Sequence, residues 1–155
     1  MTGNSESDYV VGEVWGKLGA DRYLLDLVRD RMDFVQTIKT IRLLSNKWPQ
    51  AMAKVIEDKA NGPAAIATLK HEIPGIIPFM PEGDKISRLK AVSPQIEAGN
   101  VYLPINAYWV HDFIEEVTAF PNAANDDQVD AMSQALLRFA KNRGIITLDR
   151  SVFNI

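Results

Sequence analysis

The sequence contains no cysteine and only two histidines, His71 and His111, among its 155 residues. The lack of cysteine excludes a disulfide scaffold, a cysteine-type zinc site and a thiol nucleophile. The two histidines lie too far apart to indicate a histidine-rich metal site. No run approaches 18 consecutive apolar residues, so no membrane span is predicted. The polar N-terminus, MTGNSESD, lacks the apolar core of a secretory signal peptide.

An excess of positive charge is also missing, because 17 basic residues stand against 20 acidic ones and give a net charge of −3. That balance is not typical of a protein coated for tight, nonspecific binding to nucleic acid. Apolar residues make up 46% and charged residues 24%, which is typical of a globular domain. The length predicts a single domain over residues 1–155, with residues 141–155 as a C-terminal tail.

Short strand and helix patterns alternate along the chain, which predicts an α/β fold with a mixed sheet and helices on its faces. The chain opens with two β-rich segments around a Gly-Asp turn, which predict an antiparallel hairpin. Asp33 and Gln36 have the spacing of a helix-capping box. The later pattern predicts a strand, helix and parallel strand, then three more helices. The predicted strands are 9–15, 22–28, 54–56 and 76–79, and the predicted helices are 34–48, 64–72, 84–97, 109–118 and one that starts near Asn125.

Two carboxylates, Glu57 and Asp58, follow the short buried strand 54–56. Ligands of open α/β sheets gather beyond the carboxyl ends of the strands, so this pair is a candidate site. Adjacent residues of a strand point to opposite faces, and only one of the two can therefore face a ligand there. The alternative interpretation is a solvated strand end.

A second acidic group, Asn125 to Asp130, stands at the start of the last helix. Asn125 is a suitable N-cap, and acids in a first helical turn are favoured by the helix dipole, which explains Asp126 and Asp127. Asp130 is explained less well, because it shares a helix face with Asp127. A divalent cation would relieve the repulsion among the three acids, and carboxylates suit Mg²⁺ or Mn²⁺.

One compact basic cluster is present, formed by Lys85, Arg88 and Lys90. Lys85 and Arg88 share a helical face and could contact DNA phosphates, which would position a duplex without reading its sequence. The alternative is a solvated helix face.

Four segments together resemble the nuclease domain of phage terminase large subunits. VIEDKANGPA resembles the second acidic motif of that family, and NDDQVDAMSQAL resembles the third. GDKISRLKAVSPQIEAGNVYLP resembles the segment after the second motif, and SDYVVGEVWG the stretch after the first. The segments occur in family order and cover most of residues 7–140; they are residues 55–64, 125–136, 83–104 and 7–16.

The resemblance implies an RNase H-like mixed sheet flanked by helices, and a metal-dependent endonuclease that cuts concatemeric double-stranded viral DNA during packaging. Such nucleases hold two ions, Mg²⁺ or Mn²⁺, with carboxylates. Carried over, Asp58 is the first choice for the second motif's ligand and Glu57 the next. Asp130 is the ligand of the third motif, with Asp127 as an accessory acid.

The same resemblance implies partners and a place in the cell. The partners are double-stranded DNA, the terminase ATPase domain, the small terminase subunit and the portal. The protein would come from a phage or prophage and work in the cytoplasm of the bacterial host. No membrane is involved in this interpretation.

The sequence departs from the family pattern at the first acidic motif, which belongs on a strand upstream of Ser7. Only Glu6 and Asp8 precede the hairpin as acids, so the first, central strand is predicted to be missing. No Walker A pattern occurs, so an ATPase domain is not expected either. We expect the gap to be filled by residues 1–6, by the C-terminal tail or by a neighbouring chain.

This departure keeps two other functions open. One is a catalytically inactive remnant or protein-docking module that retains the fold. The other is a different RNase H-like phosphotransferase of the resolvase or transposase type, which the segment 83–104 makes less favourable than a terminase.

Overall fold

The computed structural model describes residues 9–141 and 150–154, beginning with the predicted hairpin. The antiparallel strands β1 (Tyr9–Leu18) and β2 (Asp21–Arg31) are joined by a two-residue turn. Gly19 in this turn has a φ of +59°, which glycine adopts without steric cost. A bulge between Val14 and Trp15 shifts the register of the hairpin.

The middle of the chain forms the predicted strand–helix–strand unit. Helix α1 (Phe34–Lys47) precedes it, and the capping box at its start is confirmed: the Gln36 backbone N–H donates to Asp33 Oδ1 over 2.8 Å, and the Asp33 N–H donates to Gln36 Oε1 over 2.9 Å. Strands β3 (Ala53–Glu57) and β4 (Ile76–Phe79) are parallel and are connected through α2 (Gly62–Leu69).

The remaining elements lie close to their predicted positions. They are α3 (Lys85–Glu97), β5 (Val101–Tyr102), α4 (Val110–Ala119) and α5 (Asp127–Lys141). The predicted N-cap of the last helix is wrong by one residue. The Asp130 N–H donates to the Asp126 carbonyl over 3.0 Å, so Asp126 rather than Asn125 stands directly before the first turn.

The centre of the sheet is occupied by β6 (Arg150–Asn154), which gives the strand order β4-β3-β6-β1-β2-β5. β6 is antiparallel to β1 and parallel to β3. The central position of the sheet, whose usual strand was predicted to be missing, is therefore occupied. Of the three segments expected to take that place, the C-terminal tail is the one that does. Without β6, β1 and β3 would each present a row of unpaired backbone N–H and C=O groups inside the sheet.

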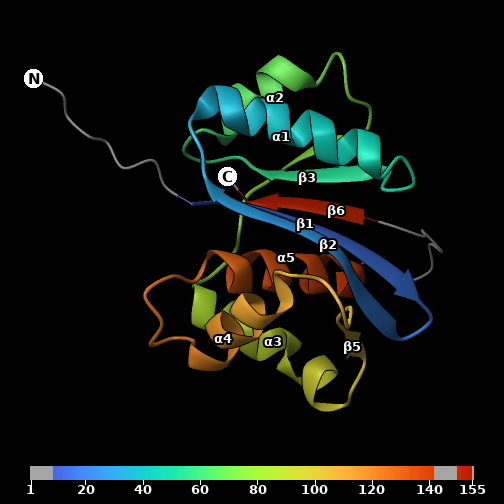
Figure 1. Ribbon diagram of the computed structural model, residues 1–155, viewed down its shortest axis with the longest axis vertical. Helices are drawn as coiled ribbons and strands as arrows, with labels where there is room; N and C mark the ends of the chain where they lie inside the picture. The colour runs from blue at the N-terminus through green and yellow to red at the C-terminus, as the bar shows by residue number, and fades with distance from the viewer. Residues whose placement is uncertain (1–8, 142–149, 155) are drawn as a thin grey trace, which may run out of the picture.

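Helices cover both faces of the sheet (Figure 1). One layer contains α1 and α2, and the other contains α3, α4 and α5. The bulge in β1 lies between two residues that serve different layers. Val14 belongs to the core under α1 and α2, and Trp15 to the core under the other three helices.

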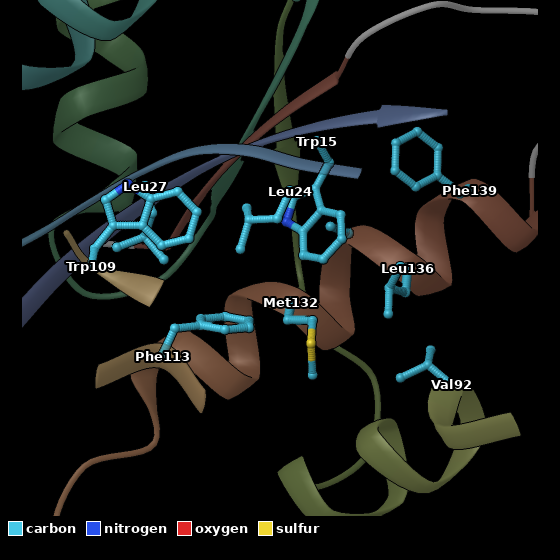
Figure 2. Packing of buried hydrophobic residues seen from close by; sticks show 10 residues of the cluster. Trp15, Leu24, Leu27, Val92, Trp109, Phe113, Met132, Leu136 and Phe139 are labelled. Carbon is cyan, nitrogen blue, oxygen red and sulfur yellow. The ribbon is translucent and has the colours of Figure 1, made fainter. Parts of the chain in front are cut away.

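The larger core lies between the hairpin and α5 (Figure 2). Trp15 and Leu24 project from the hairpin toward Met132 and Leu136 of α5, and all four are almost completely buried. Trp109, the residue directly before α4, completes one end of this core and packs edge to face on Phe113 with ring centroids 6.5 Å apart. The packing fixes α5, and with it the acidic residues at its start, against the sheet.

Deleting residues 150–155 should test the role of β6. We expect the shortened chain to lose its cooperative thermal transition, because the deletion removes the strand that β1 and β3 share as a pairing partner. Circular dichroism melting would measure this. A control is Ile105→Ala, at a position 95% exposed, which should melt like the parent chain. A deleted chain with an unchanged melting temperature would contradict the central role of β6.

Candidate active site

Glu57 lies at the carboxyl end of β3 and is buried, with 5% of its surface exposed. Ile56 packs in the core under α1 and α2, so strand alternation directs Glu57 to the opposite face, which α5 covers. Lys59 Nζ lies 3.5 Å from Glu57 Oε1. Asp58 is exposed, and its backbone N–H donates to the Phe79 carbonyl over 2.7 Å. Of the two acids, Glu57 is therefore the one on the α5 face.

The turn after β3 packs tightly on the Glu57 backbone. A Cβ atom at Gly62 would lie 1.7 Å from the Glu57 carbonyl oxygen. Only glycine therefore allows α2 to begin this close to the end of β3. Gly62 and the adjacent Pro63, which starts the helix, belong to the ANGPA part of the second acidic motif. The sequence of this motif thus fixes where the Glu57 backbone lies.

Asp130 is buried in the first turn of α5 and is held by an ion pair with Arg88 of α3. Arg88 donates to Asp130 Oδ1 from Nη2 over 2.7 Å and from Nε over 3.1 Å. The other carboxylate oxygen, Oδ2, accepts from Gln134 Nε2 over 3.2 Å. Arg88 Nη1 donates to the Gly83 carbonyl over 2.6 Å. Both charges are therefore compensated inside the protein and the Asp130 carboxylate has a fixed orientation.

The two other acids at the start of α5 are less buried. Asp126 accepts from Lys85 Nζ over 2.7 Å. Asp127 is half-buried, and burial raises its pKa while Lys85 lowers it. Lys85 and Arg88 thus both face the acids of α5, and of the predicted basic cluster only Lys90 is exposed. The DNA contacts predicted for Lys85 and Arg88 would compete with these ion pairs.

Sequence reasoning did not identify Glu13 of β1, which is completely buried. The Trp15 indole Nε1 donates to Glu13 Oε2 over 2.8 Å, but Oε1 has no hydrogen-bond partner within the described residues 9–141 and 150–154. Burial raises the pKa of Glu13 well above its usual range, the Trp15 hydrogen bond lowers it, and the charges of Glu116 and Asp130 raise it. An isolated acid inside the apolar run VVGEVWG was the signal available in the sequence.

Glu116 of α4 was also not identified, and it connects α4 to the start of α5. It accepts from the Val129 backbone N–H over 2.8 Å and from Gln128 Nε2 over 3.2 Å. Burial raises the pKa of Glu116, and these hydrogen bonds and the charge of Arg29 lower it. The first turn of α5 is thus stabilised by an acid from a neighbouring helix, as expected for the positive end of a helix dipole.

The acidic side chains of this region suit a hard divalent cation, because such ions prefer carboxylate oxygens as ligands. Glu13 Oε1 is one buried carboxylate oxygen without a hydrogen-bond partner in the described part of the chain. In the part of the chain that the structure describes, however, no three acids or histidines are close enough together to hold a metal ion. Asp58, Asp127 and Asp130 therefore do not form a preassembled metal cluster. Glu57 points to the sheet face that α5 covers, and Asp130 lies on α5 itself. The Asp130 carboxylate is bound by Arg88.

A mixed sheet with helices on both faces, and acids at the end of β3 and the start of α5, is the arrangement expected of an RNase H-like domain. A sequence model of the terminase RNaseH-like domain family matches residues 2–139. The chain belongs to that family, and the fold is RNase H-like. The comparison with curated proteins gave no match.

The family match confirms the resemblance drawn from the acidic motifs and identifies a terminase nuclease domain. The matched residues include Glu57, Asp58, Asp127 and Asp130, whereas β6 lies beyond them. None of the helices in the described ranges is long and apolar enough to cross a membrane.

Replacing Arg88 by methionine should cost about 3–5 kcal/mol of the free energy of unfolding, the usual effect of leaving one buried charge without its partner. Urea denaturation would measure the change. Lys90→Met is the matched control on the same helix, and at this exposed position we expect a change within about 0.5 kcal/mol. Equal effects of the two substitutions would show that the buried pair does not hold α3 on α5.

Glu13→Gln should change how stability depends on pH. The folded chain keeps the Glu13 proton above pH 4.5, the ordinary pKa, whereas the unfolded chain loses it. The stability of the parent chain therefore falls as the pH rises from about 4.5 toward the raised pKa. Glutamine does not titrate, so the variant should melt higher than the parent at pH 8 and much closer to it at pH 4.5.

Melting temperatures between pH 4 and 9 would check the Glu13 prediction. Glu116 and Asp127 also have raised pKa values, so part of the slope should remain in the variant. Glu115→Gln is the control, because the Glu115 side chain is 67% exposed. Parallel curves for the parent chain and Glu13→Gln would contradict the prediction.

Proposed function

We propose that this chain is the endonuclease domain of a phage terminase large subunit, which cuts concatemeric double-stranded DNA by metal-dependent phosphodiester hydrolysis. The observation that carries the proposal is Asp130, a buried carboxylate fixed at the start of α5 on the sheet face to which Glu57 also points. Membership in the terminase RNaseH-like family supports it.

Glu57 and Asp130 would hold the divalent ions, with Asp58 and Asp127 at the more solvated edge. Two bound Mg²⁺ or Mn²⁺ ions would activate a water and stabilise the departing oxygen of the phosphodiester. Arg88 and Gln134 orient the Asp130 carboxylate, and a metal ion bound there would have to share or displace the contact with Arg88. Lys59 beside Glu57 and Lys85 beside Asp126 would contact a DNA phosphate in competition with these ion pairs.

The partners and location follow from the same proposal. We propose double-stranded DNA as the substrate, and the ATPase domain, small terminase subunit and portal as the packaging machinery that delivers it. The site of action would be the cytoplasm of the bacterial host. Delivery by a packaging motor would make a strongly basic surface unnecessary, in keeping with the net charge of −3.

One observation favours the alternative of an inactive remnant or docking module. The first acidic motif of the family belongs on the central strand, and here that position is taken by β6, whose sequence RSVFN contains no acid. If the central acid is indispensable, the fold would be retained without the chemistry. A resolvase or transposase core is less well supported, because the family match is to a terminase domain.

Nicking of supercoiled plasmid in Mn²⁺ or Mg²⁺ tests the proposal. We expect the parent chain to nick DNA, and Asp130→Asn, which keeps the shape of the side chain, to lower the rate by at least about 100-fold. The control is Asp30→Asn, at an exposed position of β2, which should nick like the parent chain.

Melting curves would establish that each variant is folded, since Asp130→Asn leaves Arg88 without a countercharge. Glu57→Gln provides a second site variant with an intact Arg88 pair. A folded parent chain that does not nick in either metal would favour the remnant. A chain whose nicking survives both substitutions would have its site elsewhere.

A further inference from the structure

A cavity of about 320 Å³ lies between the end of β4, α3 and α5. Its walls include an apolar part, made by Phe79, Ala91 and Leu137, and a polar part, made by Arg88, Gln134 and Arg138. Arg88 and Gln134 are also the two side chains that hold Asp130. The cavity is thus directly linked to the candidate carboxylate.

Gln134 is 2% exposed and uses only half of its side-chain amide. Nε2 donates to Asp130 Oδ2, whereas Oε1 is buried without a hydrogen-bond partner among the residues that the structure describes. A buried carbonyl oxygen without a donor is unfavourable, so such groups usually have a partner. The partner that fits here is a ligand with an N–H or O–H donor.

Arg138 lies one turn further along α5, on the same helix face as Gln134. Its Nε is buried and has no hydrogen-bond partner in the described part of the chain. Arg138 is half-buried, and burial lowers its pKa. The acid that lines the cavity, Glu82, is exposed, so solvent screens its charge. The partner that fits Arg138 is an anion.

We propose that this cavity binds one nucleotide of the DNA strand, with its phosphate on Arg138, a donor group of its base or sugar on Gln134 Oε1, and its apolar surface against Phe79 and Leu137. A nucleotide combines these three features in one molecule. The proposal rests on the proposed nuclease function and adds to it a subsite for the substrate.

The subsite lies beside the reacting bond. Arg138 and Asp130 are eight residues apart on one helix, which is about 12 Å at 1.5 Å per residue. A phosphate held by Arg138 is therefore a different phosphate from the one on which Asp130 would act. Arg138 is a positioning residue, which holds the strand while Gln134 connects the bound nucleotide to the carboxylate.

Binding measured in EDTA tests the subsite without metal and without cleavage. The probes are thymidine 5′-monophosphate, thymidine and a tetrathymidylate, followed by NMR chemical shifts of the Gln134 side-chain amide. We expect both phosphorylated probes to bind and to shift this amide, and thymidine to bind at least about tenfold more weakly. Binding of the mononucleotide alone would overturn the assignment to a DNA strand.

Arg138→Gln should weaken binding of the tetrathymidylate about tenfold or more, since a hydrogen bond to a charged group is lost. The matched control is Arg42→Gln on α1, which lies on the other face of the sheet and pairs with the exposed Glu72. Ala91→Trp, which fills the cavity with Arg138 intact, should also abolish binding. Equal affinities of the parent chain and Arg138→Gln, or equal losses in both arginine variants, would overturn the proposal.

The two proposals can fail separately. A chain that binds the tetrathymidylate through Arg138 in EDTA but never nicks plasmid has the subsite without the nuclease activity. If the parent chain nicks plasmid but the Arg138→Gln variant binds the oligonucleotide as tightly as the parent chain does, the protein is a nuclease whose DNA strand binds elsewhere.

Discussion

The buried ion pair between Arg88 and Asp130 is the interaction on which the helical layer beside the site depends. Two charges removed from water are favourable only when each is fully compensated. Gln134 compensates the second oxygen of Asp130, and the Gly83 carbonyl accepts from the remaining arm of Arg88. These contacts fix α3 against α5 and give the carboxylate one orientation.

The sheet imposes the second constraint, because its two halves meet only through β6. The hairpin lies on one side of this strand and the β3–β4 pair on the other. Glu13 comes from the first half and Glu57 from the second, and both point to the face covered by α5. The relative positions of these acids are therefore set by a strand from the far end of the chain, beyond the residues that match the family.

Arg88 also links the stability of the fold to the candidate metal ligand Asp130. Arg88, which stabilises Asp130, occupies its Oδ1, so a metal ion held by Asp130 as proposed would compete with this ion pair for one carboxylate. Gln134 holds the other oxygen and lines the adjacent cavity. Arg88 and Gln134 thus contribute to the packing of α3 on α5, to the candidate centre and to the cavity of the proposed subsite.

The sequence by itself determined the elements and the acidic motifs, because capping residues, turn residues and apolar periodicity act locally. The capping box of Asp33 and Gln36, the turn at Gly19 and the acids of α5 are examples. Tertiary structure alone decided that β6 lies between β1 and β3, that Lys85 and Arg88 face α5, and that Glu13 is completely buried. Strand pairing and the compensation of buried charge join residues far apart in the chain, and no local pattern specifies those partners.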